Sequence, residues 1–320
     1  MRPGTAPRKN WPGFLPRPVL RCSCRRSPPI RNWPGWSARQ KKEQPMPRSP
    51  SKPSAAEISG AAALLLAFLI SLFSPTLAVL PLALFLLACL ATPFLAGYGF
   101  FLPVISRGSP ETKQVALTFD DGPWPASTPI LLDLLARHTL QATFFVVGRQ
   151  AEKHPELIAA ILAQGHTIGN HSLRHDSLLM LRRPKTLQKD IHATQEILQK
   201  SGITPCVFRP PAGITNPRLK QVLAQENLLA VNYSCRAMDG GNRNIDNLAE
   251  KILTRLRPGD IIMLHDLPPQ GKALSSIWQK ELDRLFAALQ NNGQVVSLEK
   301  IIRHPVMTVI PSNKKRSSVN

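Results

Sequence analysis

The stretch Val115-Ala116-Leu117-Thr118-Phe119-Asp120-Asp121-Gly122-Pro123 runs from an apolar strand pattern directly into two adjacent carboxylates and a Gly-Pro stop. Two neighbouring carboxylates repel each other unless a cation or a proton relieves the charge. Because the two side chains point in different directions, one of them can bind a metal while its neighbour faces a water held by that metal. An Asp-Asp-Gly-Pro turn is also common in ordinary loops, so this stretch alone leaves both interpretations open.

Outward from this stretch, residues 108–305 alternate short β-rich runs with helical patterns, which predicts one α/β domain. Seven such strands favour parallel pairing in a barrel or a doubly wound sheet, and in both folds functional residues gather where strands end. The predicted strands are residues 114–119, 142–147, 166–168, 206–208, 229–234, 260–264 and 294–297, and the predicted helices are 129–137, 155–163, 184–200, 217–225, 244–256 and 275–290.

Three further polar motifs follow predicted strands. His171 and His175 are four residues apart, and on a helical turn that spacing lets both imidazoles reach one ion. In the proline-stiffened loop of residues 208–213, Arg209 can orient a carboxylate by charge-assisted hydrogen bonds. His265 ends an apolar strand and can serve as a general acid near neutral pH. Taken alone, the histidine pair is more often solvent-exposed, the Arg-Pro-Pro loop is more often a plain turn, and His265 is more often a capped or surface histidine. All of these motifs occur at the ends of predicted strands, however, and this shared position favours an active site.

These motifs together resemble those of the polysaccharide deacetylase family, also called carbohydrate esterase family four or the NodB-homology domain. The resemblance spans roughly Lys113 to Arg303, and the motifs TFDDGP at 118–123 and HSLRH at 171–175 match the family pattern completely. It implies a distorted (β/α) barrel with about seven strands, and a metal-dependent hydrolase that removes N-acetyl or, less often, O-acetyl groups from a carbohydrate. Such an enzyme is a carbohydrate deacetylase acting on carbon–nitrogen bonds other than peptide bonds.

The resemblance also assigns roles to individual residues. Asp121, His171 and His175 would hold a divalent metal, with zinc the expected ion, and Asp120 would be the base that deprotonates the water held by that metal. The other implied roles are Arg209 orienting Asp120, His265 protonating the departing amine, Asp239 tuning His265, and Pro211 and Ala212 lying on the oxyanion and substrate side.

Three positions depart from the family pattern. Arg236 stands where an aspartate is usual, Gly240 stands where a tryptophan is usual, and Ala212 replaces a common aromatic residue. The loss of two aromatic platforms removes surface on which sugars stack. These departures favour a small or lipid-linked saccharide over a polymeric glycan. They leave two alternatives open, a non-catalytic glycan-binding membrane protein and an N-deacylase of a lipid-linked sugar.

The charge of the chain is concentrated in its N-terminal part. Residues 1–56 hold 13 of the 40 Lys and Arg residues, 12 of the 31 prolines and one acidic residue, which predicts a disordered basic tail. Met46 opens a conventional membrane-protein beginning, so we expect that residues 1–45 are not part of the native product. Residues 306–320 are predicted to be a C-terminal tail. Because the excess charge lies in one tail, we expect no nucleic-acid partner.

Residues 57–106 are predicted to be a transmembrane segment with one or two helices. No charged side chain occurs in the 49 residues from Ile58 to Ser106, and a span needs about 20 apolar residues. The run divides at Ser74-Pro75-Thr76, so the number of spans and the topology stay open. The expected partners are therefore membrane lipid and a carbohydrate substrate. The expected location is the bacterial cell envelope at the inner membrane, with the family function favouring a periplasmic or extracellular catalytic domain.

Overall fold

The computed structural model describes residues 53–311, apart from residues 96, 112, 177–178 and 292. The predicted basic tail of residues 1–56 lies almost wholly outside the described residues, as does the hypothesis about residues 1–45. Strand β11 (Met307–Val309) falls inside the predicted C-terminal tail and pairs antiparallel with β5 (Ile203–Pro205). The folded domain therefore continues past the predicted boundary at residue 305.

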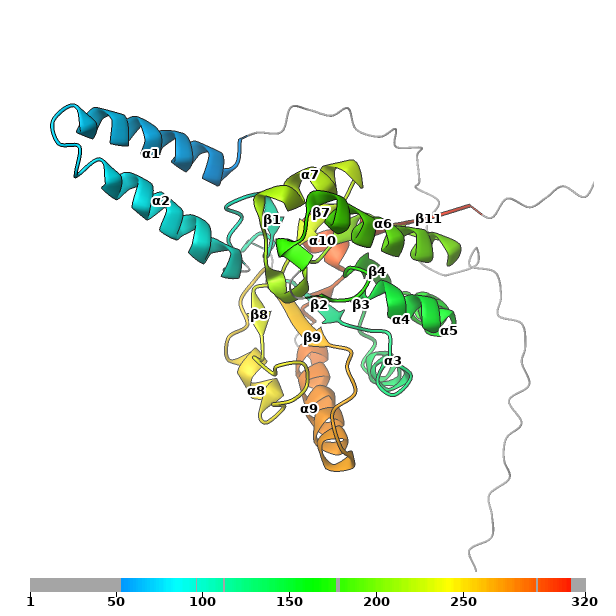
Figure 1. Ribbon diagram of the computed structural model, residues 1–320. Helices are drawn as coiled ribbons and strands as arrows, with labels where there is room; N and C mark the ends of the chain where they lie inside the picture. Colours follow the sequence, from blue (N-terminus) through cyan, green and yellow to red (C-terminus); the bar gives the residue numbers. More distant parts are fainter. Residues whose placement is uncertain (1–52, 96, 112, 177–178, 292, 312–320) are drawn as a thin grey trace, which may run out of the picture. The chain divides into compact units, whose positions relative to one another are not determined.

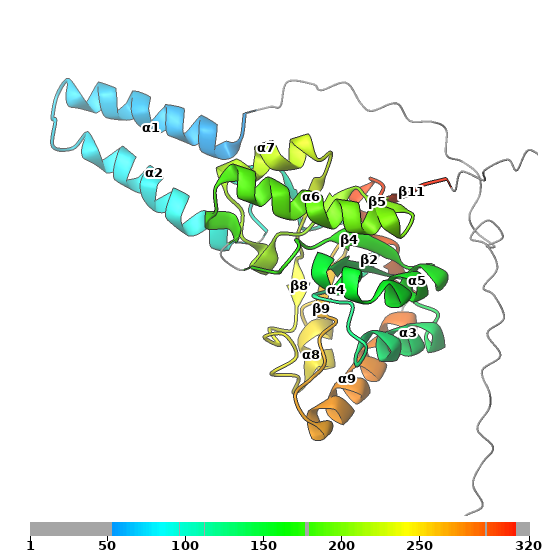
Figure 2. The same ribbon diagram turned by 45° about the vertical axis from the view of Figure 1, so that its right-hand side comes forward.

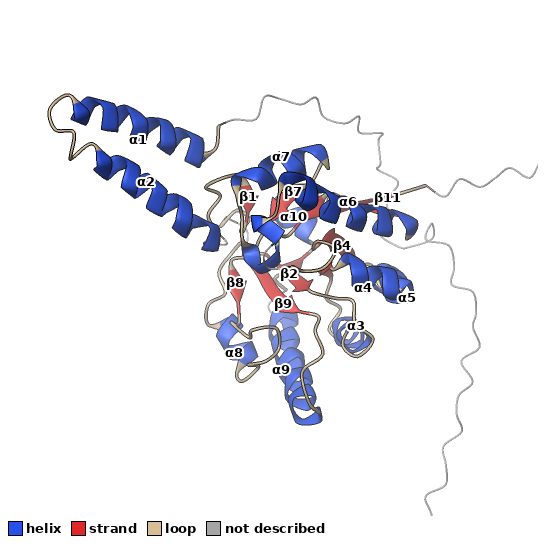
Figure 3. Cartoon of the chain, viewed as in Figure 1, coloured by secondary structure: helices blue, strands red, loops and turns tan. Residues whose placement is uncertain are grey.

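A parallel sheet forms the centre of the domain, and Figure 3 shows its strands in red with helices in blue around them. Every one of the seven predicted strands has an observed counterpart. The strands are β1 (Val104–Ile105), β2 (Val115–Asp120), β3 (Ala142–Val146), β4 (Thr167–Asn170), β6 (Val207–Phe208), β7 (Leu229–Val231), β8 (Cys235–Arg236), β9 (Ile261–His265) and β10 (Val295–Val296). Their order is β1-β7-β6-β4-β3-β2-β9-β8, and β10 pairs with β2.

The two halves of the sheet come together at one end. Arg107, just after β1, forms an antiparallel bridge with Asp260, just before β9, and their side chains form an ion pair of 2.7 Å. The amide of Gly108 also donates a hydrogen bond to the carbonyl of Gly259. Because β1 and β9 stand far apart in the strand order, these contacts require a curled sheet. The fold therefore fits a distorted (β/α) barrel of parallel strands.

The helices connect successive strands, and α3, α4 and α5 lie along the same flank of the sheet in Figures 1 and 2. Four of the predicted helices have a proline in the first turn, where the missing N–H costs little. The helix bounds are α3 (Thr128–Arg137), α4 (Gly148–Lys153), α5 (Pro155–Ala163), α6 (Pro184–Lys200), α7 (Pro217–Gln225), α8 (Leu248–Leu253), α9 (Lys272–Asn291) and α10 (Leu298–Ile302).

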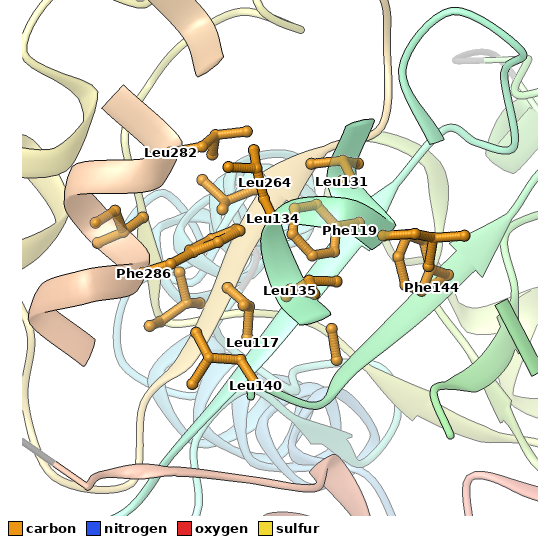
Figure 4. Close-up of a cluster of buried hydrophobic side chains, with 14 of the residues drawn as sticks. Leu117, Phe119, Leu131, Leu134, Leu135, Leu140, Phe144, Leu264, Leu282 and Phe286 are labelled. Carbon is orange, nitrogen blue, oxygen red and sulfur yellow. The ribbon is translucent and has the colours of Figure 1, made fainter. Parts of the chain in front are cut away.

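The main core lies between the outer face of the sheet and helices α3 and α9 (Figure 4). Leu117 and Phe119 of β2 point into it, and the Phe119 ring stacks on Phe144 with centroids 5.1 Å apart. Because side chains alternate along a strand, Thr118 and Asp120 point to the other face of the sheet. The same strand thus anchors the core and delivers a carboxylate to the interior of the barrel.

The apolar segment of residues 57–106 folds into α1 (Ala55–Ser71) and α2 (Val79–Ala91), and the chain between them includes Ser74-Pro75-Thr76, where the sequence predicts a division. Over residues 53–311 with the gaps noted, no helix has both the length and the apolar character to cross a membrane. The structure therefore does not provide the predicted one or two transmembrane helices. The division leaves 17 residues in α1 and 13 in α2, whereas a span takes about 20.

His166, which precedes β4, is buried at the end of the strands opposite to the polar sequence motifs. Its Nδ1 accepts a hydrogen bond from the amide of Ala142, and its Nε2 has no hydrogen-bond partner among the described residues. Burial lowers the pKa of His166 from 6.5 to about 4. The neutral imidazole is therefore the form that the folded state accommodates.

We expect His166 to make the protein less stable in acid. Because its folded pKa lies below its unfolded pKa, its contribution is fully present above pH 6.5 and is lost as the pH falls toward 4. The shift corresponds to at most about 3 kcal/mol. His166→Asn keeps an acceptor for Ala142 but does not titrate, so its urea-unfolding free energy should fall less between pH 7 and pH 4 than that of the wild type. Equal losses in both proteins would contradict this assignment.

Candidate metal centre and active site

The polar motifs predicted from the sequence meet at one edge of the sheet. Asp120 of β2 pairs in register with His265 of β9 and with Phe145 of β3, and Asn170 of β4 pairs with Phe208 of β6. Because these strands are parallel, the residues that follow them leave the sheet on the same side. The Asp-Asp, His-Ser-x-x-His, Arg-Pro-Pro and Leu-His motifs are thus brought together, as the sequence predicts.

Asp121, His171 and His175 form a compact cluster of metal-ligating side chains. Their ligand atoms all lie within 4.8 Å of one another. The Oδ1 atom of Asp121 is 3.3 Å from Nε2 of His171 and 3.1 Å from Nε2 of His175. This Oδ1 is buried and has no hydrogen-bond partner among the described residues. A buried carboxylate oxygen that faces two imidazole nitrogens without a hydrogen bond fits a cation bound between the three groups.

The tautomer of His171 supports the same interpretation. Its Nδ1 lies 2.8 Å from the carbonyl oxygen of Arg209, which can only accept, so Nδ1 carries the hydrogen. The lone pair of Nε2 therefore points toward Asp121, as in metal-ligating histidines whose other nitrogen donates to a carbonyl. Two imidazoles and one carboxylate are a donor set that suits zinc and leaves positions open for water and substrate.

The charges in the cluster favour an ionised carboxylate. Burial would raise the pKa of Asp121, but the imidazoles of His171 and His175 lower it to about 2. Burial lowers the pKa of His175, and the neighbouring His171 lowers it further. Burial would also lower the pKa of His171, but the charges of Asp120 and Asp121 raise it on balance. Asp121 is therefore available as an anionic ligand over the whole physiological range of pH.

The two histidines do not lie on a helical turn, and this expectation from their spacing is wrong. They lie in an irregular loop in which Ser172 and His175 have positive φ values of 68° and 52°. Side chains fix this loop, because Asn170 Oδ1 accepts from the amide of Ser172 and Ser172 Oγ accepts from the amide of His175. Asp190 on α6 accepts from the amide of Leu173.

Asp120 is held by Arg209, which is fully buried in the barrel. Its NH1 donates to Oδ1 of Asp120 at 2.7 Å and to Oγ1 of Thr118 at 2.8 Å. Its Nε and NH2 donate to the carbonyls of Val231 and Asn232, and its guanidinium lies 3.9 Å from the ring centroid of Phe145. These contacts fix the guanidinium in one position, so Asp120 has one defined orientation.

His265, at the end of β9, and Asp239, which follows β8, form a second pair of polar side chains at the same edge of the sheet. The Nδ1 of His265 lies 2.8 Å from Oδ2 of Asp239, so Nδ1–H donates and Nε2 is left for the substrate. Burial would lower the pKa of His265, but the hydrogen bond and charge of Asp239 raise it on balance. Burial would likewise raise the pKa of Asp239, and its hydrogen bond with His265 lowers it on balance.

Two residues to which the sequence analysis assigned no role support this arrangement. The backbone amide of Asn242 donates to Oδ2 of Asp239, and its side-chain Nδ2 donates to the carbonyls of His265 and Leu267. Asp266 is buried, its amide donates to the carbonyl of Asp120, and its carboxylate accepts from the hydroxyls of Ser127 and Thr128 at 2.6 Å. Burial raises the pKa of Asp266 to about 7.

Gly122 is required by this packing. A Cβ atom at residue 122 would lie 2.2 Å from Oδ2 of Asp266, well inside contact distance. The indole Nε1 of Trp124 donates to the carbonyl of Asp121, which also holds this turn.

The sequence signal for Asp266 was its place directly after His265 in the strand-end motif. No local pattern marked Asn242, because its partners come from residues 239, 265 and 267.

The residues that depart from the family pattern also lie at this edge. Arg236 is exposed on β8 and donates from NH1 to the hydroxyl of Tyr233 at 3.0 Å. A Cβ atom at Gly240 would meet nothing within 4 Å, so open space stands where the family has an aromatic side chain. Ala212 is exposed at a positive φ of 55°, beside the buried Pro211.

The geometry agrees with comparisons to known proteins. The family model for polysaccharide deacetylase matches residues 107–231. A chitooligosaccharide deacetylase of Sinorhizobium fredii is 34% identical over 61% of this chain and 94% of the relative. A peptidoglycan-N-acetylglucosamine deacetylase of Bacillus cereus is 35% identical over 58% of this chain and 66% of the relative.

A solved structure shares the fold as well as the sequence. The crystal structure of a peptidoglycan N-acetylglucosamine deacetylase in complex with a naphthalenyl N-oxidanyl-benzamide superposes with a TM-score of 0.57 at 32% identity. The superposition covers 63% of this chain and 94% of that chain. A shared barrel, a shared motif set and nearly complete coverage of the shorter relatives lead to one conclusion: the chain belongs to the polysaccharide deacetylase family and is a carbohydrate deacetylase.

Proposed function

We propose that the protein is a metal-dependent hydrolase that removes N-acetyl groups from a carbohydrate, with Asp120 as the base and His265 as the acid. The observation that carries the proposal is the convergence of Asp121, His171 and His175 within 4.8 Å beside these two groups. A divalent ion held by these three side chains, for which the donor set favours zinc, would polarise the acetyl carbonyl and lower the pKa of a bound water toward 7.

Asp120 is suited to take a proton because Arg209 holds only one side of its carboxylate. Oδ1 accepts the hydrogen bond from Arg209, and this charge-assisted contact fixes the plane of the carboxyl group. The proton of the attacking water therefore meets a carboxylate that is already oriented. General base help of this kind contributes about 10²–10⁴-fold to the rate.

His265 favours an amide over an ester as the bond that is cleaved. A departing amine must receive a proton as the carbon–nitrogen bond breaks, whereas an alcohol is a better leaving group. Asp239 raises the pKa of His265, so the imidazole keeps the proton that the amine needs. The backbone of Ala212, in the proline-stiffened loop with Pro211, is proposed to help bind the oxyanion and the substrate.

The substrate class is proposed from the relatives and from the departures of this chain. The relatives act on chitooligosaccharides and on peptidoglycan, both of which carry N-acetylated sugars. With Ala212 and Gly240 at two positions where the family has aromatic residues, the site lacks two stacking surfaces. We therefore propose a short or lipid-linked N-acetylated saccharide, including an N-acyl group on a lipid-linked sugar.

The test is an acetate-release assay with the full chain. Chito-oligomers, peptidoglycan, O-acetylated xylan and a lipid-linked N-acetylated sugar are compared, with and without a chelator and after zinc is restored. Release from an N-acetylated saccharide that a chelator stops and zinc restores supports the proposal. Glycan binding by a metal-free protein without any release would instead support the non-catalytic alternative.

The pair of His265 and Asp239 gives a prediction about pH. Asp239→Asn removes the anion that raises the pKa of His265, so the pKa of the imidazole falls. The alkaline limb of the kcat profile, where the acid loses its proton, should then move to lower pH, and kcat should fall. Asp246→Asn, a change of an exposed aspartate, is the control. An unmoved alkaline limb would exclude His265 as the acid.

We also propose that the protein works in the bacterial cell envelope at the inner membrane, with its catalytic domain on the periplasmic or extracellular side. The relatives that act on peptidoglycan support this location. The measurement is protease accessibility of the catalytic domain in spheroplasts. Digestion only after the membrane is lysed would contradict the proposed side.

A further inference from the structure

Helices α1 and α2 form an antiparallel hairpin, and its inner contact is made by small residues and the ring of Phe85. The helices lie side by side in Figures 1 and 2. A Cβ atom at Gly60 would lie 2.9 Å from the ring of Phe85, so the glycine leaves room for this ring between the two helices. Buried positions are few, Ala67 in α1 and Pro81 in α2. Small residues at a helix–helix contact with large residues outside are typical of packing in lipid.

The outer surface of the hairpin is apolar in every direction. The successive residues Leu64, Leu65 and Leu66 are 64%, 61% and 50% exposed, although a helix turns by about 100° at each step. Phe73, at the tip of the hairpin, is 91% exposed. A helix that is apolar all round belongs in a protein core or in a membrane. A single protein partner would cover one side and leave the other in water.

Charged groups occur at the base of the hairpin, where it joins the catalytic domain. Ser54 caps α1, and Glu57 forms an ion pair of 3.0 Å with Lys220 on α7. The amide of Ala56 donates to the carbonyl of Phe100, and Phe85 packs against the apolar cluster that contains Phe100. The hairpin is thus fixed to the domain at one end, and its uncharged part begins directly above that anchor.

Exposed arginines and a lysine lie beside this anchor. We call Arg182, Arg183, Lys185 and Arg218 the basic rim; all four are exposed. The NH1 of Arg218, on α7, donates to the carbonyls of Leu181 and Arg182, which joins the two segments of the rim. Leu181 itself is 75% exposed. Arg182 also pairs with Asp176 at 3.2 Å, so one acidic side chain lies among the four basic ones. A basic surface beside an apolar protrusion matches the charge of an anionic lipid surface.

We propose that the α1–α2 hairpin inserts into a lipid bilayer from one side, with the basic rim against anionic headgroups. The 17 residues of α1 rise about 25 Å and the 13 residues of α2 about 20 Å. The hydrocarbon core is about 30 Å thick. The hairpin therefore enters the hydrocarbon deeply and returns to the same surface. This inference does not depend on the catalytic assignment.

The first experiment is flotation of the full chain with vesicles of phosphatidylcholine, alone or mixed equally with phosphatidylglycerol. The double variant Leu65→Asp/Leu86→Asp places charges at outward-facing positions that are 61% and 60% exposed. Each charge at depth should weaken binding by roughly 100-fold, so the variant should no longer float. Ile277→Asp on α9, which also replaces an exposed apolar residue, is the matched control and should float as the wild type does.

The second experiment reports where the tip lies and what the rim does. In Phe73→Trp, lipids brominated on the acyl chain should quench more fluorescence than in the wild type, because the new indole lies in hydrocarbon. Arg182→Gln/Arg183→Gln should bind vesicles of phosphatidylcholine alone as the wild type does. It should lose only the additional binding that the wild type shows when phosphatidylglycerol is present. Urea unfolding of every variant shows that the catalytic domain has folded, and acetate release from a soluble chito-oligomer is measured separately.

Three results would overturn the inference. The wild type could fail to float with either vesicle, or the Asp double variant could float as well as the Ile277→Asp control. A defined dimer in the absence of lipid that the double variant converts to monomer, without vesicle binding, would show that a second copy covers the hairpin. Because acetate release is measured separately, a failed catalytic proposal is distinguished from a failed lipid proposal.

Discussion

Asp120→Asn is expected to lower kcat by about 10²–10⁴-fold while the protein still binds its metal. Asparagine has nearly the same shape, and its carbonyl oxygen can accept the hydrogen bond that Arg209 gives to Asp120. The variant therefore keeps this hydrogen bond, and it loses the negative charge that pairs with Arg209 and the ability to take a proton. Acetate release and metal content are measured on the same preparation.

Asp133→Asn is the matched control for this change. Asp133 lies on α3, its side chain is 69% exposed, and it pairs with Arg137 on the surface. We expect its kcat to equal that of the wild type. An Asp120→Asn enzyme that retains most of its activity would show that another group accepts the proton, and loss of its metal would show that Asp120 is a ligand.

Arg209→Met is expected to destabilise the fold by about 3–5 kcal/mol, as breaking a buried ion pair does. The arginine is fully buried, and its removal leaves Asp120 and Thr118 without the hydrogen bonds of 2.7 and 2.8 Å that they now receive. Arg209→Lys should recover little, because an ammonium group cannot reproduce the planar set of contacts. Urea unfolding gives the free energies.

The comparison for Arg209 is Arg137→Met. Arg137 also pairs with aspartates, Asp133 at 3.2 Å and Asp283 at 3.3 Å, but it is half exposed. Exposed ion pairs contribute only about 0–1 kcal/mol. If the two methionine variants lost the same free energy of unfolding, the buried hydrogen bonds between Arg209 and Asp120 would not stabilise the fold more than an exposed ion pair does.

The sequence predicted the location of the site because strand ends are local features. Asp120 and His265 follow apolar runs that could be recognised residue by residue, and parallel pairing brings such ends to one edge. The ligand loop was predicted less well. The spacing of His171 and His175 suits a helical turn, but the hydrogen bonds of Asn170 and Ser172 hold it as a loop.

The roles of residues whose partners are distant in sequence could not be predicted in this way. Asp266 accepts from Ser127 and Thr128, which are 139 and 138 residues away. The apolar run after Ile58 predicted helices correctly, but composition does not fix where a helix ends. The chain around Ser74-Pro75-Thr76 and Pro93 after α2 divide the run into helices shorter than a membrane span.

The measurement that tests the central claim most directly is the metal content of the wild type against His175→Ala. His175 is partly exposed, so its loss should spare the fold, and His154→Ala at the junction of α4 and α5 is the control. After dialysis against zinc, elemental analysis should give one ion per chain in the wild type and the control and almost none in His175→Ala. Equal zinc in all three proteins, or none in the wild type, would contradict a metal held by Asp121, His171 and His175.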